Sequence, residues 1–440
     1  METDLKIAHV FNLANDGWAV VKGLRALGID ADLIIRRPDH VACLPQWEEA
    51  EIDLTKLEDQ YYPDWETLCE NWPIPDHVKV WDVPRSSSMN ETVDGVGRAM
   101  LYCTRIANLN PVETIRSRWR DVLNFVAKLN EKKERRQIHR QLPQLRLLGD
   151  YDLVIGHWPF AIFAPSYRAM YKKPYLVYDA GWIRTLHDPI SRMAYDRLGR
   201  AGYKYADKIL FANVDTYEMF LRNGYDPSKL IYTSFAIDPN IYRPLEEQET
   251  LGLNDQHRSP VFFMPSRQDP TKGNISVLYA FKRYLERRNN AVLRLVNWGS
   301  IQADYKKHLT IIKDLEIARN IEWLPVMNKR LLVKYYNAAD IVFDQFELGA
   351  LGTTAPEAMS CGKPVISYVK PELWTPWHNE PPPVANAGTS DEILQQMIAL
   401  EDAGIRKEFG ERGRKWTFEN CEPTAVANKQ MQVYEETLKR

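Results

Sequence analysis

The feature that most constrains the fold is a repeated alternation of short apolar segments with longer amphipathic ones. Residues 6–11 and 31–35 are apolar runs of strand length, and residues 18–27 between them carry apolar side chains at helical spacing. Strand–helix–strand units of this kind build parallel sheets, and ligands bind at the carboxyl ends of their strands. The chain therefore starts as an α/β domain.

The same alternation continues to residue 223 and then repeats in a second block. In the first block, strands are predicted at 153–155, 175–178 and 208–211, with helices at 160–171, 189–205 and 216–223. In the second block, strands are predicted at 261–264, 292–296, 321–323, 341–343 and 364–368, with helices at 275–287, 305–315, 329–337 and 355–361. A chain of 440 residues is also too long for one ordinary core.

Two doubly wound, Rossmann-like domains are therefore expected. The first covers residues 1–242, a polar hinge follows at 243–258, and the second covers 259–420. Residues 421–440 are predicted to form a C-terminal helix that could pack back on the first domain.

Two segments interrupt the first domain. Residues 37–110 lose periodicity and are rich in Pro, Trp and Tyr, which predicts an irregular but folded insertion. Residues 111–142 predict a basic helix, and the stretch 116–146 carries ten Lys/Arg against three Asp/Glu. That surface either faces anionic lipid or an anionic acceptor, or is a solvated helix face packed on its own domain.

Bulk composition excludes several classes of protein. A net charge of -2 gives no global reason to expect a nucleic-acid partner. Five scattered cysteines without CxxC spacing argue against a disulfide framework or a structural zinc site. Since neither a secretory signal nor a run of about 18 apolar residues is visible, we expect a cytoplasmic protein that at most touches a membrane surface.

The first candidate binding loop follows the first strand of the second domain. Residues 265–273 place Arg267 and Lys272 five positions apart, where a helix begins. A helix N-terminus offers free N–H groups and partial positive charge, so these two cations would complete an anion site. Solvated charges in a helix-start loop are the alternative.

The second candidate loop, 344–356, follows another strand of the same domain. It combines glycine and threonine, with proline at the start of the next helix, so its backbone can approach a phosphate or sugar closely. We expect Glu357, in the first helical turn, to accept hydrogen bonds from two ribose hydroxyls. A first-turn acid that merely stabilises the helix dipole is the alternative. The residues of this loop and first helical turn that could bind a phosphate, sugar or ribose are Glu347, Gly349, Gly352, Thr353, Thr354 and Glu357.

As a set, these segments resemble the retaining GT-B glycosyltransferases of family 4. Arg267 and Lys272 match that family's Arg-x4-Lys phosphate pair. Residues 320–325 match its Asn-x-x-Phe-x-Gly strand, and residues 335–340 match its Leu-Tyr-x-x-Ala-Asp helix end. Residues 357–366 match the segment that holds the second glutamate of its Glu-x7-Glu motif.

The resemblance implies two domains that face each other across a cleft and transfer a sugar from a nucleoside-diphosphate sugar, UDP- or GDP-linked, to a carbohydrate or lipid-linked acceptor. It implies no metal and no other cofactor: Arg267 and Lys272 would stabilise the leaving diphosphate. One position departs from the family, because Gly349 stands where the first glutamate contacts the transferred sugar. Either Glu347 swings in, or N–H groups near Gly352 to Thr354 serve instead.

Three residues of the first domain are candidates for the same cleft. Gly17 lies where the first strand meets its helix and would permit close approach of a phosphate or acceptor. A plain helix cap at Asn15 or Asp16 is the alternative for this loop. His157 follows a strand and aligns with the family's histidine near the reacting sugar. Asp179 closes the next strand and could orient a hydroxyl of the acceptor or the sugar.

Two other functions fit the same fold. Because Gly349 replaces a glutamate, the chain could be a non-catalytic subunit that binds nucleotide or a partner enzyme. A nucleotide-sugar epimerase of the same fold would interconvert donors without an acceptor.

Overall fold

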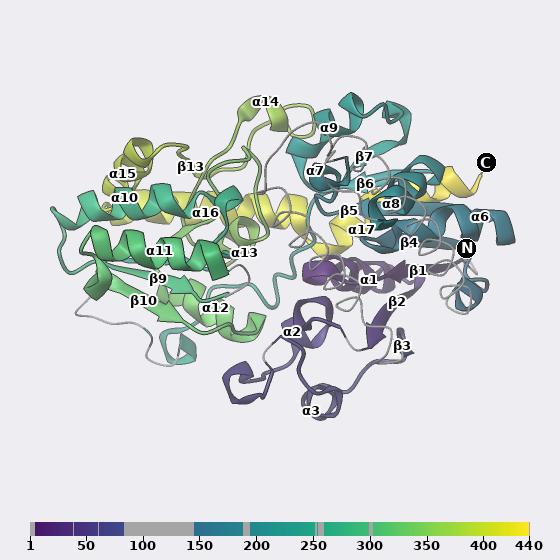
Figure 1. Ribbon diagram of the computed structural model, residues 1–440, viewed down its shortest axis with the longest axis horizontal. Helices are drawn as coiled ribbons and strands as arrows, with labels where there is room; N and C mark the ends of the chain where they lie inside the picture. The colour runs from purple at the N-terminus through teal and green to yellow at the C-terminus, as the bar shows by residue number, and fades with distance from the viewer. Residues whose placement is uncertain are drawn as a thin grey trace, which may run out of the picture.

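The computed structural model describes residues 5–37, 39–59, 61–82, 145–187, 194–250, 253, 259–298 and 302–439. It has two α/β domains side by side, one drawn in purple and teal and the other in green in Figure 1. The predicted basic helix at 111–142 lies outside the described residues, as does the part of the predicted insertion from 83 to 110. The structure therefore does not bear on the expected membrane-surface contact through 116–146.

The N-terminal domain is built on a seven-stranded parallel sheet in the order β3-β2-β1-β4-β5-β6-β7. Apolar side chains on its two faces enter two separate clusters: Ile7 and Leu33 lie in one, and Ala8 and Ile34 in the other. Such two-sided burial is expected of a parallel sheet covered by helices. The strands are β1 (Lys6–Val10), β2 (Asp30–Arg37), β3 (Val78–Asp82), β4 (Leu153–His157), β5 (Tyr175–Asp179), β6 (Ile209–Phe211) and β7 (Leu230–Tyr232). The helices named below are α1 (Asp16–Ala26), α2 (Gln46–Glu49), α3 (Trp65–Asn71), α6 (Ala164–Tyr171), α7 (Ile183–Leu186), α8 (Ala194–Tyr205) and α9 (Tyr217–Arg222).

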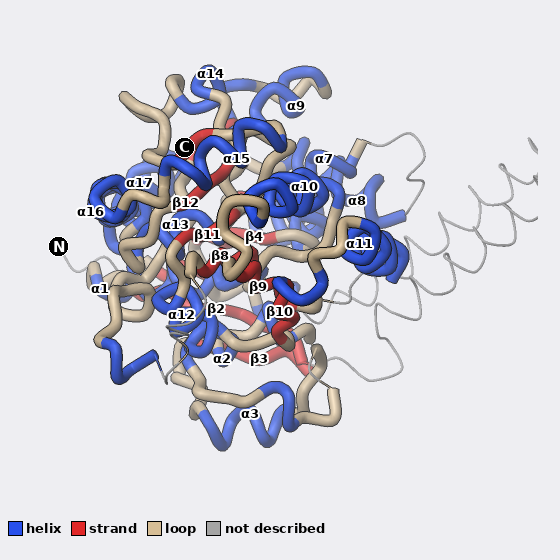
Figure 2. The backbone as a smooth tube through the Cα atoms, turned by 90° about the vertical axis from the view of Figure 1, so that its left-hand side faces the viewer, coloured by secondary structure: helices blue, strands red, loops and turns tan. Residues whose placement is uncertain are grey.

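The C-terminal domain repeats this plan with a six-stranded parallel sheet in the order β10-β9-β8-β11-β12-β13. Figure 2 shows its helices around its strands. The strands are β8 (Val261–Met264), β9 (Val292–Val296), β10 (Ile321–Leu324), β11 (Ile341–Phe343), β12 (Val365–Ser367) and β13 (Ala385–Asn386). The helices are α10 (Asn274–Leu285), α11 (Gln302–Asp314), α12 (Lys329–Ala338), α13 (Thr354–Ser360), α14 (Pro371–Trp374) and α15 (Ser390–Ala399).

The last two helices join the domains. α16 (Ala403–Cys421) packs against α13, and α17 (Pro423–Leu438) packs against α1. Gly23 of α1 allows this approach, since an added Cβ there would lie 2.2 Å from the carbonyl oxygen of Pro423. Figure 1 shows the two helices, in yellow, running from one domain to the other. The C-terminal helix thus lies on the first domain.

One sequence-based assignment needs correction. The segment from residue 37 was expected to be irregular, but it contains the short helices α2 and α3 and the edge strand β3, which pairs with β2. The sequence did not predict β3 because the strand is only five residues long and lies at the edge of the sheet. Edge strands are partly exposed and carry polar residues, here Lys79 and Asp82, which interrupt the apolar pattern.

Candidate active site

In both sheets the chain reverses its winding direction once, and such switch points are where open α/β sheets bind ligands. In the N-terminal domain the reversal falls between β1 and β4, and in the C-terminal domain between β8 and β11. The loops that follow β8 and β11 are the two loops predicted to hold the donor. Topology therefore brings both to one edge of one sheet.

The loop after β8 carries the two predicted cations in different surroundings. Arg267 keeps 55% of its side chain exposed and lies 3.9 Å from Asp269. Lys272 is half-buried and donates from Nζ to the amide oxygen of Gln345 at 2.8 Å. Asp269 caps the turn by accepting from the Thr271 amide at 2.9 Å. Among the described residues, no carboxylate oxygen lies closer than 3.9 Å to either cation, so both can turn to an incoming anion.

The loop after β11 is folded around a buried carboxylate, Asp344. Its Oδ2 accepts from the Gly352 amide at 2.6 Å, whereas Oδ1 makes no hydrogen bond to a described residue. An added Cβ at Gly352 would lie 2.8 Å from Asp344 Oδ1 and 3.3 Å from Lys272 Nζ. The two loops thus meet at Gly352, whose own N–H is already used by Asp344 and is not free for a phosphate.

Electrostatics link these groups. Burial lowers the pKa of the Lys272 ammonium; Asp344 opposes that shift, while the positive charges of Arg267 and of Arg184 from the other domain reinforce it. Burial raises the pKa of Asp344, which feels the charges of both Lys272 and Glu357. Lys272 and Glu357 therefore lie on the same side of their domain, as a shared site requires.

Gly349 occupies its position for a local reason. Its φ of +73° favours glycine, and an added Cβ would lie 2.6 Å from Cγ of Lys370. Its carbonyl oxygen accepts from the Lys370 amide at 3.1 Å and from Trp374 Nε1 at 3.2 Å. A glutamate could not simply be restored here. Glu347, the nearest upstream acid, is exposed, and its Oε1 lies 3.3 Å from the position of an added Cβ at Gly273.

Glu357 is buried at the start of α13 and is already partnered. Its Oε1 lies 2.5 Å from Lys329 Nζ, and its Oε2 accepts from the Tyr336 hydroxyl at 2.8 Å. The Thr353 carbonyl oxygen accepts a hydrogen bond from the Glu357 amide, and Thr354 is the first residue of α13. Carboxylate oxygens retain further lone pairs, so ribose hydroxyls could still bind, but they would share this carboxylate with Lys329.

The surroundings of Glu357 extend into the N-terminal domain. Burial raises the pKa of Asp16, at the start of α1, to about 8, and the negative charge of Glu357 adds to that shift. Burial likewise raises the pKa of Glu48, in α2, to about 7, although Lys22 and Lys329 oppose it. Buried carboxyls of both domains thus face each other around Lys329.

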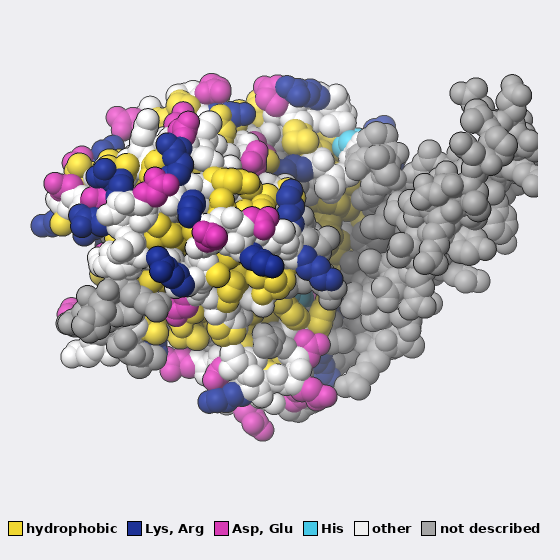
Figure 3. Space-filling model, turned by 60° about the vertical axis from the view of Figure 1, so that its left-hand side comes forward, with side chains coloured by type: hydrophobic (Ala, Val, Ile, Leu, Met, Phe, Trp, Pro, Cys, Tyr) yellow, Lys and Arg dark blue, Asp and Glu magenta, His cyan; other side chains and the backbone are white. Residues whose placement is uncertain are grey.

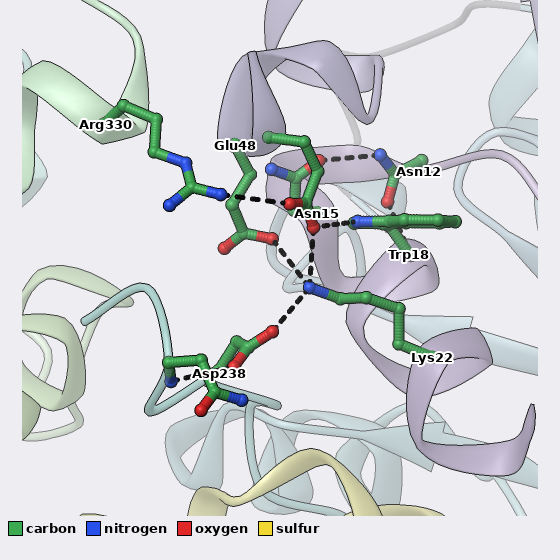
Figure 4. Close-up of polar contacts among 9 residues, drawn as sticks. Asn12, Asn15, Trp18, Lys22, Glu48, Asp238 and Arg330 are labelled. Carbon is green, nitrogen blue, oxygen red and sulfur yellow. Dashed lines mark hydrogen bonds and ion pairs between the residues drawn. The ribbon is translucent and has the colours of Figure 1, made fainter. Parts of the chain in front are cut away.

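A second polar cluster, centred on Lys22, lies beside them and crosses the domain boundary. Lys22 Nζ lies 2.7 Å from Glu49, 2.7 Å from Asp238 and 4.0 Å from Glu48. Arg330 reaches across from α12 to Glu49 at 3.4 Å. Figure 4 shows Lys22 among these groups, with Arg330 approaching from the other domain. The cluster ties the insertion of the first domain to the second.

In the N-terminal domain, His157 and Asp179 are both buried at strand ends. His157 shares a hydrogen bond of 3.1 Å with His9, and its Nδ1 makes none to a described residue. Burial holds its pKa well below the usual range, so the ring is neutral. Asp179 accepts from the amides of Gly181 and Ile183 and from the Tyr203 hydroxyl. Its oxygens serve the fold of their own domain.

The absence of a side chain at Gly17 makes room for the backbone of its own domain. An added Cβ would lie 2.6 Å from the carbonyl oxygen of Phe11, so the close approach predicted for a ligand is made by backbone. The preceding loop is strained, with positive φ at Phe11, Ala14 and Asn15. Strain of this kind persists only where surrounding structure enforces it and is frequent at functional sites.

Sequence reasoning missed Lys329 and Asp344. Each left a signal: Lys329 puts a cation in a first helical turn, where the helix dipole disfavours it, and Asp344 puts a charge directly after a buried strand. Both positions are explained by partners that come from elsewhere in the fold.

Part of the chain is similar to known glycosyltransferases. Residues 247–375 match the profile of the glycosyl transferases group 1 family. A GDP-mannose-dependent monoacylated alpha-(1-6)-phosphatidylinositol monomannoside mannosyltransferase from Corynebacterium glutamicum is 26% identical over 188 residues, 39% of this chain and 47% of that protein. A D-inositol 3-phosphate glycosyltransferase from Rhodococcus jostii is 26% identical over 170 residues, 37% of each chain. The matches span less than half the length of these curated relatives.

Solved structures resemble nearly the whole chain. Anabaena Alr3699/HepE in complex with UDP and glucose has a TM-score of 0.63 at 14% identity, covering 98% of this chain and 99% of that one. Sucrose-phosphate synthase from Thermosynechococcus elongatus has a TM-score of 0.61 at 14% identity, covering 99% of both. The predicted GT-B fold is confirmed. Over the matched segments the chain is similar to glycosyltransferases, which is the enzyme class that the sequence predicted.

The described residues contain neither a candidate metal-binding cluster nor a helix that could span a membrane. No group of three or more His, Cys, Asp or Glu side chains there is arranged to hold a metal ion. Within the same residues, no helix is long and apolar enough to cross a membrane. Figure 3 shows one face of the molecule, where basic and acidic side chains are interspersed around hydrophobic ones.

Proposed function

We propose that this protein transfers a hexosyl group from a nucleoside-diphosphate sugar to a hydroxyl of a carbohydrate or lipid-linked acceptor, with retention of configuration and without a metal. The observation that carries the proposal is the meeting of the two loops at the switch point of the C-terminal sheet. There Lys272 and Arg267 carry positive charges that no carboxylate of the described residues approaches closer than 3.9 Å.

In this proposal the donor's diphosphate lies against Arg267 and Lys272. As the bond to the sugar breaks, negative charge grows on the leaving diphosphate, and preorganised cations stabilise it. The acceptor hydroxyl attacks from the face that the diphosphate leaves, and a phosphate oxygen takes its proton. Closure of the two domains would exclude water and protect the donor from hydrolysis.

The names of the two curated relatives guide the choice of substrates. One is GDP-mannose-dependent and acts on a phosphatidylinositol monomannoside, and the other is named for D-inositol 3-phosphate. GDP-mannose and inositol-containing acceptors are therefore the first substrates to try. UDP-linked donors come next, because a structural neighbour was solved with UDP-glucose.

The test is release of nucleoside diphosphate by the purified chain from GDP-mannose, UDP-glucose and UDP-N-acetylglucosamine, with and without acceptors. We expect one donor to be consumed, slowly alone and faster with an acceptor. Binding of a nucleoside diphosphate without turnover of any donor would instead favour a non-catalytic subunit, the alternative that Gly349 supports. Conversion of one nucleotide-sugar into another would show an epimerase.

A further inference from the structure

Arg184 is a cation held ready at the end of a strand of the N-terminal domain. It lies in α7, directly after β5, with 24% of its side chain exposed. Its Nε donates to Asp215 Oδ2 at 2.8 Å and its Nη2 donates to Asp215 Oδ1 at 2.7 Å. This fork fixes the plane of the guanidinium. The third nitrogen, Nη1, makes no hydrogen bond to a described residue.

The chain makes room for that free nitrogen. Gly181 has a φ of +105°, and an added Cβ would lie 2.1 Å from Arg184 Nη1 and 3.6 Å from Asn213 Nδ2. Asn213 follows β6, is only 7% exposed, and its amide nitrogen makes no hydrogen bond to a described residue. Two unused N–H donors from neighbouring strands therefore lie close together.

The turn beside these donors contacts the C-terminal domain. Asp215 belongs to the 3-10 turn Val214–Thr216, and this turn packs against α14 of the C-terminal domain. In α14, Trp374 donates a hydrogen bond to the carbonyl oxygen of Gly349. Arg184 is also near enough to Lys272 for its charge to act on that ammonium. Cations from both domains thus approach one another, and their repulsion is relieved when an anion lies between them.

We propose that Arg184 and Asn213 form the N-terminal half of a phosphate-binding site whose other half is Lys272 and Arg267. The inference rests on the proposed function and extends it to the opposite domain. The bound group is a phosphate, supplied either by the diphosphate of the donor or by a phosphorylated acceptor. In either case binding draws the two domains together across the interface.

The test compares Arg184→Gln and Asn213→Ala with the wild-type chain, with Lys272→Ala, and with Arg168→Gln as matched control. Arg168 is an arginine of the same domain that is also paired with an aspartate, Asp207 at 2.8 Å. Calorimetry measures the affinity for GDP, UDP, GMP and UMP, and for inorganic phosphate alone and with saturating nucleoside diphosphate. Thermal unfolding checks each fold, and Asn213→Ala leaves the Arg184–Asp215 pair intact.

If the donor supplies the phosphate, both variants weaken diphosphate binding at least tenfold and leave monophosphate binding unchanged. If the acceptor supplies it, diphosphate binding is unchanged and the variants lose the inorganic phosphate that the wild-type chain binds beside the nucleotide. Affinities like those of the wild-type and Arg168→Gln chains in every titration would overturn the proposal and leave the pair purely structural. Weaker diphosphate binding by Lys272→Ala would then still support the proposed function, whereas a wild-type chain that binds no nucleotide would count against the function itself.

Discussion

The two domains present different kinds of side chain to the interface between them. In the N-terminal domain, the hydrogen bonds that Asp179 makes to described residues stay within that domain, as do the three nearest described atoms beside Gly17, and His157 is bonded to His9. In the C-terminal domain, Arg267 stays exposed and Lys272 is bonded only to a neutral amide among the described residues. A polar residue at a strand end marks a site only when part of its bonding capacity is left for a ligand.

Glu357 does not follow this division. It lies in the C-terminal domain, yet Lys329 and Tyr336 occupy its carboxylate, as partners occupy Asp179 in the other domain. The useful distinction is therefore between committed and uncommitted groups, and a domain boundary only approximates it. The following four predictions test that distinction.

The largest effect is expected for Lys272→Ala. Removing a cation aimed at the leaving diphosphate should lower kcat for donor consumption by about two to three orders of magnitude, as loss of one preorganised donor does elsewhere. Steady-state assays give the rate, and thermal unfolding should show a fold close to that of the wild-type chain. Lys307→Ala, an exposed lysine of the same domain, is the control and should leave kcat unchanged. Equal activity of the two variants would remove Lys272 from the site.

Asp179→Asn should act on stability rather than on chemistry. An amide in place of the carboxylate would turn an N–H group toward backbone N–H donors, so we expect a loss of about 1.5–3 kcal/mol in the free energy of unfolding. Urea unfolding measures that loss, and kcat below the transition should stay within about threefold. A hundredfold fall in kcat with unchanged stability would instead make Asp179 part of the reaction and break the comparison.

Between pH 7.5 and 8 the free energy of unfolding should fall as pH rises. Burial raises the pKa of Asp16 to about 8 and of Glu48 to about 7, so the folded chain holds protons that the unfolded chain has already released. Each such group lowers stability by about 1.4 kcal/mol per pH unit until pH reaches its raised pKa. Histidines whose pKa is lowered by burial, such as His9 and His157, act in the opposite sense at lower pH, but from pH 7.5 upward they contribute little because an unfolded imidazole is then about nine-tenths neutral.

Urea unfolding at several pH values measures this slope, and Asp16→Asn is the variant that tests its cause. The variant should flatten the slope between pH 7.5 and 8, where Glu48 has largely titrated. A slope identical to that of the wild-type chain would mean that Asp16 is ionised in the folded protein.

The smallest effect is expected for Glu347→Gln. The side chain is exposed, so its loss should change the KM for the donor by no more than about threefold. Initial rates over a range of donor concentrations measure KM. A tenfold rise would show that Glu347 moves into the site and takes the place of the glutamate that Gly349 lacks.

The two α/β domains and the loops of the site could be predicted from the order of the amino acids. Apolar periodicity is local, so strands such as 261–264 and 292–296 were readable, and parallel topology then placed residues 265–273 and 344–356 at strand ends. Spacing likewise marked Arg267 and Lys272. Each of these inferences depends on residues close together along the chain.

Which of those residues are free to bind depends on contacts between distant parts of the chain. Lys329 neutralises Glu357 from 28 positions away, Asp344 takes the amide of Gly352, and Lys370 fills the space beside Gly349. No local pattern records such partners, because hydrogen-bond satisfaction and burial are properties of atoms brought together by folding. The chain encodes where the site lies, and packing determines which of its groups remain uncommitted.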